Sequence, residues 1–429
     1  MLRLPSVLAS SIAAAIATIG LYRVGGSLIA ASTAGLVLAF ESNALFYGVE
    51  LRPFAFTILF GTIACWIATK PFAIENLADN HAVSTLAVLA IAAALFQPTS
   101  VGVIAWLLIL RFAVSRFYSV SSQPWVWRTS LVAIFLILFV LLSGQVLGDA
   151  WHHRGQWSEM GRAKSIMQIW QAWPWGSLVV IPALLLIATT MNPSSHGAKR
   201  SAFVHCWIVP LSAFLAVCAF WLTSALGIAP IFHRRYFVAC LPMLAWACGQ
   251  CLAMAIQELG RFAISARWRL AISIAFAAAP IVTLLSTQGT LKKLLAGETQ
   301  LTKRGEDWRE ASEFLKAQQP VVKSVSLSAG LIESSRLLSD PDAKVATYAQ
   351  WYLTYPLRGP YALPNVKAVD LSSDVRMIEL PLIFRGSRTM AQQWLSAKGH
   401  SWDTLPVSHS FGGIQVISLP SVDLPTEKN

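Results

Sequence analysis

Charged residues are scarce in this sequence. Asp, Glu, Lys and Arg make up 13% of its 429 residues, whereas hydrophobic residues make up 55%. Because a soluble domain contains about 25% charged residues, this scarcity excludes a single soluble globular domain. The hydrophobic residues occur in blocks that end near Gln288, and the composition after that residue is ordinary. The sequence therefore predicts a membrane domain over residues 1–288 and a second domain over residues 289–429.

Cysteine is absent from residues 289–429, which excludes a disulfide framework in the second domain. All six cysteines fall in hydrophobic blocks, and two of them, Cys248 and Cys251, have the spacing of redox and metal motifs. No His or carboxylate lies in the same block, so we interpret this pair as helix-packing residues. The second domain also contains no glycine-rich phosphate loop, nucleophile triad or metal-ligand spacing.

Negative charge is scarce in the membrane domain. Residues 1–288 contain 7 Asp and Glu against 17 Lys and Arg, whereas residues 289–429 contain 14 against 16. The formal net charge of +12 therefore belongs mainly to loops between hydrophobic blocks. This distribution argues against a nucleic-acid-binding surface.

Hydrophobic blocks of about 20 residues predict membrane-spanning helices, and shorter blocks can span when they pack against neighbours. We predict ten such helices, at residues 5–22, 26–46, 52–69, 82–97, 99–116, 129–147, 176–194, 202–225, 236–256 and 268–288. The fold class is therefore a polytopic all-α membrane protein followed by a small α/β domain. In that domain we expect helices at residues 306–316 and 389–397 and strands at residues 321–327, 367–371, 377–382 and 413–419.

The distribution of basic residues orients these helices, because cytoplasmic loops are enriched in Lys and Arg. One set of alternate loops contains Arg23, Lys70, Arg111, Arg116, Arg128, Lys199, Arg200, Arg261, Arg267 and Arg269. We predict that this set is cytoplasmic and that the opposite loops and residues 289–429 are extracytoplasmic. With this parity the N-terminus is also outside; as an alternative, residues 1–20 form a signal peptide with Arg3 in its basic region.

Several basic residues fall in the outer loops, against the expected bias. They are Arg52, Arg154, Arg162, Lys164, Arg234 and Arg235. Basic groups at this depth favour an anionic ligand, and the alternative is contact with lipid phosphates by side chains that extend to the membrane surface. A planar guanidinium can hold two phosphate oxygens at once, which makes Arg52, Arg234 and Arg235 candidate phosphate ligands.

Four short stretches resemble motifs of one family, in the order and spacing that the family has. Residues 46–55 contain Tyr47, Glu50 and Arg52 in a Tyr-x-x-Glu-x-Arg-x-Phe-Ala pattern. Three more stretches resemble other motifs of the same family. Residues 2–6 resemble the start of its second span, residues 235–242 resemble its late Arg-Tyr-(apolar)-Leu-Pro motif, and residues 306–311 resemble its Asp-Trp-Arg helix. Together they resemble the GT-C superfamily of membrane glycosyltransferases, in its protein O-mannosyltransferase and aminoarabinose-transferase branch.

This resemblance implies transfer of a sugar from a polyprenyl-phosphate donor to a glycan, lipid or protein acceptor at the outer face of the bacterial inner membrane. It implies catalytic roles for Glu50 and Arg52, with a structural Glu50–Arg52 ion pair as the alternative. The candidate substrate-binding residues are Tyr47, His152, Arg154, Arg234, Arg235 and Tyr236. The partners are then membrane lipid and the lipid-linked sugar, with no cofactor, metal or nucleic acid. Adjacent rings such as His152 and His153 cannot easily share one metal ion.

The sequence departs from the family in two places. Residues 2–6 match the family's second span, so the first span and the first outer loop, which carries the acidic residue treated as catalytic, are expected upstream of Met1. Gln97 stands where many relatives have a His. These departures leave a non-catalytic relative open as an alternative, and a transporter or flippase of lipid-linked glycans is the rival from another class. Such a transporter would predict buried charges within spans and internal repeats.

The outer segment 149–175 is rich in tryptophan. Ile166, Ile169, Trp170 and Trp173 recur at helical spacing, which predicts an amphipathic helix at the membrane surface. Tryptophan at that level anchors a protein in the interface, and the alternative is a role in stacking against a sugar or gating the donor.

We interpret Glu41 as a residue at a helix end.

Overall fold

The computed structural model describes residues 4–49, 54–69, 76–118, 161–190, 199–296, 308–318, 325–328, 363, 366–369, 381–397 and 408–417. The chain divides into two compact units, Met1–Thr302 and Lys303–Asn429. The first unit is helical, and the second combines helices with a small mixed sheet. The structure thus bears out an apolar helical part followed by a small α/β part.

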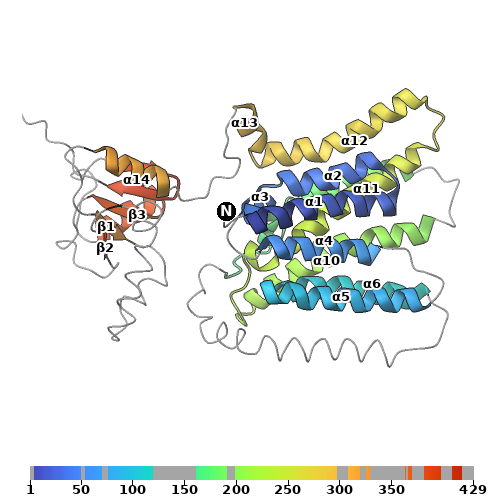
Figure 1. Cartoon of the computed structure of the whole chain (residues 1–429), viewed down its shortest axis with the longest axis horizontal. Helices are drawn as coiled ribbons and strands as arrows, with labels where there is room; N and C mark the ends of the chain where they lie inside the picture. The colour runs from blue at the N-terminus through green and yellow to red at the C-terminus, as the bar shows by residue number, and fades with distance from the viewer. Residues whose placement is uncertain are drawn as a thin grey trace, which may run out of the picture. The chain divides into compact units, whose positions relative to one another are not determined.

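The longer helices of the first unit lie side by side with their axes nearly parallel (Figure 1). In chain order they are α1 (Leu4–Gly25), α2 (Leu28–Phe40), α3 (Ser42–Val49), α4 (Phe54–Thr69), α5 (Asn76–Phe96), α6 (Ser100–Tyr118), α8 (Met167–Ala172), a π-helical turn η2 (Gly176–Val180), α9 (Ile181–Thr190), α10 (Lys199–Ala225), a 3-10 turn η3 (Arg234–Phe237), α11 (Cys240–Leu259), α12 (Ala266–Thr287) and α13 (Thr290–Leu295). The hydrophobic blocks predicted within the described residues fall on these helices, with the block 26–46 divided between α2 and α3 and the block 176–194 between η2 and α9. The predicted helix at 129–147 lies outside them.

Four of the described helices are long and apolar enough to cross a membrane: α1, residues Cys206–Ala225 of α10, α11 and α12. The pair Leu28–Phe40 and Ser42–Gly48, bent by 62°, would make a fifth. Shorter apolar helices occur at Phe54–Thr69, Ser84–Phe96, Ser100–Val114 and Gly176–Thr190. The structure therefore supports a membrane protein with four or five such helices in its described part, and the number ten stays a prediction.

Helix α11 is the centre of the bundle, and 16 of its 20 residues are buried. Small residues let helices approach closely in a bundle of apolar helices. A Cβ atom on Gly249 would lie 2.9 Å from the Cβ of Ala34 and 3.0 Å from the carbonyl oxygen of Ala30. A Cβ atom on Gly61 of α4 would lie 2.8 Å from the Cγ of Pro242. Both glycines therefore allow the neighbouring helices to pack directly on α11.

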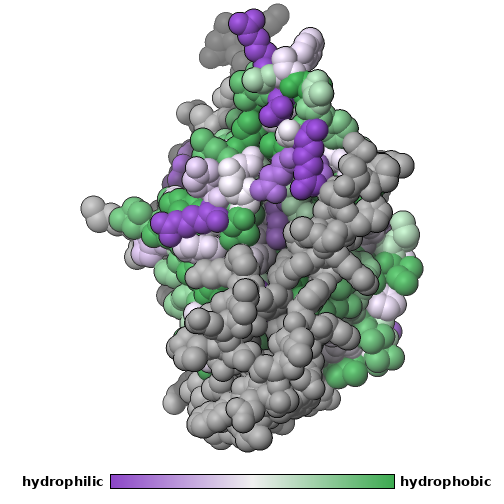
Figure 2. Space-filling view, turned by 90° about the vertical axis from the view of Figure 1, so that its right-hand side faces the viewer, coloured by the Kyte–Doolittle hydropathy of each residue, from purple (hydrophilic) through white to green (hydrophobic). Residues whose placement is uncertain are grey.

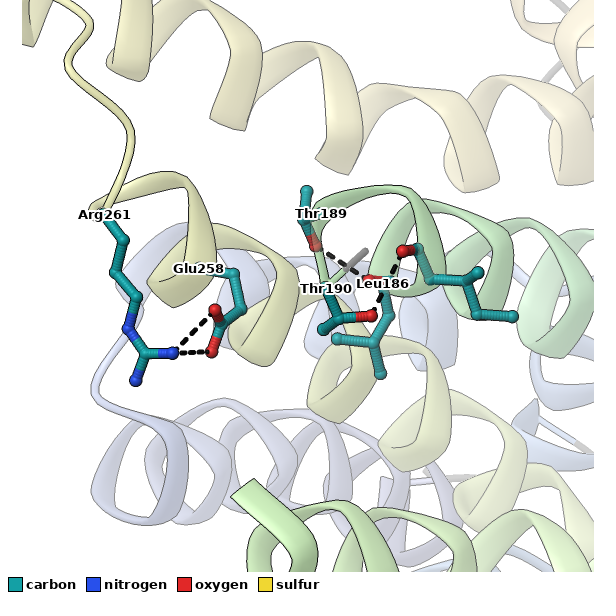
Figure 3. Close-up of polar contacts among 6 residues, drawn as sticks. Leu186, Thr189, Thr190, Glu258 and Arg261 are labelled. Carbon is teal, nitrogen blue, oxygen red and sulfur yellow. Dashed lines mark hydrogen bonds and ion pairs between the residues drawn. The ribbon is translucent and has the colours of Figure 1, made fainter. Parts of the chain in front are cut away.

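Basic residues lie at the end of the bundle where α1 and α11 finish and α12 begins. Gln257 donates to the carbonyl of Gly25 at 2.7 Å, which joins the ends of α11 and α1. Figure 2 faces this end and shows hydrophilic side chains gathered on it; Arg23 and Arg267 are exposed there. Arg261 and Glu258 form an ion pair of 2.7 Å near the end of α9 (Figure 3). We call this the basic end.

One arginine predicted for the cytoplasmic side lies inside a helix. Arg111 of α6 is buried, and its Nη1 donates to the carbonyl of Ala68 at 3.0 Å. The last carbonyls of an α-helix have no partner within the helix, so this bond satisfies one of them at the end of α4. Arg111 is therefore a buried charge within the predicted span 99–116.

The second unit has a five-stranded sheet in the order β2-β1-β3-β5-β4. The strands are β1 (Val325–Ser328), β2 (Val366–Val369), β3 (Leu382–Arg385), β4 (Ser408–Phe411) and β5 (Ile414–Ile417), and the helices are α14 (Trp308–Ala317) and α17 (Arg388–Ala397). Strand β1 runs parallel to β2 and β3, and β5 runs antiparallel to β3 and β4.

Period-two alternation explains how the two helices attach to this sheet. Leu327, Ile383 and Val416 share a core with Ala311 and Leu315 of α14. Neighbouring residues of the same strands, including Phe384 and Ile417, pack instead with Ala391 and Leu395 of α17. The strand predicted at 377–382 lies mostly outside the described residues and meets β3 only at Leu382, and β4 was not predicted.

Candidate functional site

A pocket of about 580 Å³ lies in the first unit, at the end opposite the basic end. Three parts of the chain that are distant in sequence line it. The break between α2 and α3 contributes Ser42 and Asn43, the segment around α8 and η2 contributes Trp170, Trp173 and Trp175, and the last turns of α12 contribute Thr283, Thr287 and Gln288. Arg234 of η3 is the charged residue among the described lining residues. A volume of this size is ordinary for a small-molecule site.

The break between α2 and α3 is organised by Glu41, whose side chain is 1% exposed. One carboxylate oxygen, Oε2, accepts from the backbone N–H of Ala44 at 2.6 Å, which satisfies a free donor of the first turn of α3. The other, Oε1, accepts from Asn43 Nδ2 and from Gln288 Nε2, both at 2.8 Å. Gln288 in turn accepts from the backbone N–H of Ser42 at 3.0 Å. A buried carboxylate is stable only when donors replace its lost water, and these three bonds do so.

The tryptophans of the pocket differ in exposure. Trp173 and Trp175 are 3% and 4% exposed, whereas Trp170 on α8 is 52% exposed. The indole N–H of Trp175 donates to the carbonyl of Ile169 at 2.9 Å, and the ring of Trp173 meets Phe237 edge to face at 5.6 Å. The helix expected near residues 166–173 is therefore present as α8. Only Trp170 has the exposure of an interfacial anchor, and Trp173 and Trp175 are packing residues that also form the pocket wall.

The η3 turn holds the basic residues predicted to bind substrate. Nη2 of Arg234 donates to the carbonyl of Gln171 at 2.8 Å, which fastens the turn to the α8 segment. Nη2 of Arg235 donates to the hydroxyl of Tyr236 at 2.8 Å, and its guanidinium lies 4.8 Å from the centre of that ring. The side-chain amide of Gln97 donates to the carbonyl of Arg235. Gln97 therefore joins the turn between α5 and α6 to η3.

His233 caps η3, since its Nδ1 accepts from the backbone N–H of Arg235 at 3.3 Å. Burial, together with the charges of Arg235 and Arg234, lowers the pKa of His233 from 6.5 to about 4. The imidazole is therefore neutral at physiological pH. The positive charge of this turn then comes from its arginines alone.

The structure gives different outcomes for the predicted site residues. Glu50, Arg52, His152 and Arg154 lie outside the described residues. Arg234 lines the pocket, whereas Arg235 and Tyr236 share its turn and are not among the described lining residues. Tyr47 on α3 is buried between Phe46 and Phe54, with ring centres at 5.2 and 4.9 Å. Tyr47 therefore has a packing position beside the helix break.

Sequence reasoning missed three polar residues of this end. Glu41 was interpreted only as a helix-end residue, and it joins α3 to α12. Gln97 was noted only as a departure from the family, and Gln288 only as the last residue of a span. The available signal for Glu41 was a carboxylate inside a hydrophobic block, because such a group is retained only with buried partners.

Among the described residues, no group of three His, Cys, Asp or Glu side chains is placed to hold a metal ion. The arrangement can instead accommodate a ligand with an anionic group near Arg234 and neutral polar groups near the amides and hydroxyls. No protein-family model, curated protein or solved structure matches this chain.

Proposed function

We propose that this protein is a glycosyltransferase that moves a sugar from a polyprenyl-phosphate donor to an acceptor at the extracytoplasmic face of a bacterial inner membrane. One observation carries the proposal: Arg234, three tryptophans and a set of amides and hydroxyls converge on one pocket at the end of an apolar helical unit. A lipid-linked sugar phosphate has the matching parts, namely an apolar chain, an anionic phosphate and a polar ring.

In the proposed reaction an acceptor hydroxyl oxygen attacks the anomeric carbon of the sugar. The bond between that carbon and the phosphate oxygen breaks, and the polyprenyl phosphate leaves with the electron pair. Negative charge therefore grows on the phosphate, and a fixed guanidinium in a site with little water stabilises it. In this proposal Arg234, which lines the pocket, supplies the guanidinium, and Arg52 is expected to share the role.

The proton of the acceptor hydroxyl needs a base. No described lining residue of the pocket is a carboxylate, and Glu41 already accepts three hydrogen bonds. The proposal therefore assigns the base to none of the described residues, and it keeps the expectation that Glu50 positions Arg52 or the acceptor. The ten spans and the extracytoplasmic second domain belong to the same proposal.

Transfer by the purified protein in lipid vesicles tests this function. The donor is a polyprenyl-phosphate-linked sugar, and product is separated from donor by chromatography. Arg234→Ala should weaken donor binding by about tenfold or more, because a charge-assisted hydrogen bond contributes about 1.5–3 kcal/mol. Arg52→Ala should abolish transfer while the protein still inserts into the membrane.

Arg267→Ala is the matched control, because Arg267 is exposed where α12 begins, at the basic end. It should leave binding and transfer unchanged. Donor binding without product would favour the non-catalytic relative, and movement of the intact donor across the bilayer would favour the flippase. An Arg234→Ala variant that binds donor like the wild type would refute the role given to this arginine.

A further inference from the structure

We propose that the pocket recognises the neutral hydroxyl groups of the donor sugar, and that Glu41 is the positioning residue that orients the two amide side chains for this task. This inference rests on the proposed function and names the part of the substrate that this pocket binds. It is carried by the hydrogen bonds that connect the buried carboxylate of Glu41 to the partly buried amides of Asn43 and Gln288.

The orientation of both amides follows from these bonds. An amide side chain can turn by 180° and exchange its donor and acceptor ends. Glu41 is an acceptor, so the Nδ2 of Asn43 and the Nε2 of Gln288 turn toward it. The Oε1 of Gln288 then accepts from the backbone of Ser42. In a reversed Gln288 amide, the oxygen would face the Glu41 carboxylate, which is also an acceptor, and the NH₂ would face the backbone N–H of Ser42, which is also a donor. The observed orientation is therefore the stable one.

Each amide retains hydrogen-bonding capacity after these contacts. An NH₂ group has two donors and a carbonyl oxygen has two lone pairs, and each atom named above uses one of them in the Glu41 network. Asn43 and Gln288 both line the pocket. A hydroxyl group can donate to one such oxygen and accept from one such NH₂, which is the pattern that sugar hydroxyls need.

The rest of the lining agrees with a sugar ring next to a phosphate. Trp170 presents an exposed indole, and the nonpolar C–H face of a pyranose can stack on such a surface. Thr283 and Thr287 add hydroxyls on the α12 side. Arg234 supplies one cation, and its bond to Gln171 occupies one of five guanidinium N–H donors. A single cation beside neutral donors and acceptors fits a lipid-linked sugar in which the phosphate carries the charge and the sugar ring is neutral.

Two lipids separate sugar recognition from binding of the lipid phosphate. Protein in vesicles is titrated with polyprenyl phosphate and with the same lipid that carries the sugar. The wild type should bind the sugar-bearing lipid more tightly. Glu41→Gln keeps the size of the side chain, but its single oxygen cannot replace both carboxylate oxygens, so at least one of the three donors faces an NH₂ group and the network that orients the amides is weakened. We expect about a tenfold loss of affinity for the sugar-bearing lipid, equivalent to one or two hydrogen bonds, and unchanged affinity for polyprenyl phosphate.

Trp170→Ala and Asn43→Ala provide tests that do not depend on Glu41, because a variant of a buried carboxylate can fail to fold. Both should reduce affinity for the sugar-bearing lipid alone, and Glu41→Asp should retain part of it. An equal loss for both lipids in Glu41→Gln would mean a purely structural role and would overturn the positioning claim. Equal binding of the two lipids by the wild type would overturn sugar recognition while the proposed function stands. A wild type that binds neither lipid would refute the proposed function itself.

Discussion

Gly249 gives the sharpest prediction about how the helical unit is held together. In Gly249→Ala the new methyl group would lie 2.2 Å from the Cδ2 of Leu21, 2.9 Å from the Cβ of Ala34 and 3.0 Å from the carbonyl oxygen of Ala30. The leucine can move, but the other two atoms belong to the frame of α2 and cannot. Overpacking of this kind costs about 1–3 kcal/mol, whereas alanine gains about 1 kcal/mol over glycine in helix propensity. The difference is a net destabilisation of about 0–2 kcal/mol, and we expect about 1 kcal/mol.

The assay is thermal unfolding of the protein in detergent at one fixed scan rate, since unfolding of such proteins is often irreversible. Gly249→Ala should lower the apparent Tm by about 1–2 °C. The control is Gly102→Ala on α6, where the new methyl group would meet its nearest atom, Cζ of Phe220, at 3.4 Å. This variant keeps the propensity gain without the clash and should be neutral or stabilising. If both variants have the same Tm, direct packing of α11 on α2 through Gly249 is refuted.

Two further predictions concern the η3 turn and the topology. His233 has a pKa of about 4 in the folded protein and about 6.5 when unfolded. The unfolded state therefore binds more protons between these values, and His233 should reduce stability as the pH falls from about 6.5 to 4. His233→Gln should remove this part of the slope in pH-dependent unfolding, and an unchanged slope would contradict the assignment. The C-terminus is tested with two reporter enzymes fused after Asn429. A reporter that functions only outside the cytoplasm should be active there, and activity of a reporter that functions only in the cytoplasm would invert the proposed orientation.

The positions of the helices were predictable from the sequence because they depend on local properties. The interior of a membrane offers no water to the backbone, so an uninterrupted run of apolar residues must form its backbone hydrogen bonds within its own segment. Such a run therefore forms a helix wherever it packs. The segments 5–22 and 268–288 accordingly appear as α1 and α12 with ends shifted by a few residues. In the second domain, strand alternation located β1, β2 and β5, but strand boundaries depend on pairing partners, and β4 was not predicted.

The candidate site was predictable only in part. Arg234 was predicted because it is a basic residue in a predicted outer loop, where basic residues are usually scarce. A basic residue at such a position favours an anionic ligand, so its charge alone pointed to the site. The amides of Asn43 and Gln288 carry no such signal in the sequence. They come together because α2 breaks at Glu41 and α12 ends beside the break, although the bonded residues Ser42 and Gln288 are 246 positions apart.

The sequence by itself thus determined the apolar helices, their separation from an α/β part and the excess of basic residues in the first part, since each follows from composition along the chain. Only the tertiary structure decided which helix ends meet, and with them the bend at Glu41, the burial of Trp173 and the walls of the pocket. The physical reason is that a buried carboxylate or amide acquires its orientation from partners supplied by other helices. Those partners are defined by packing in three dimensions and not by their distance along the chain.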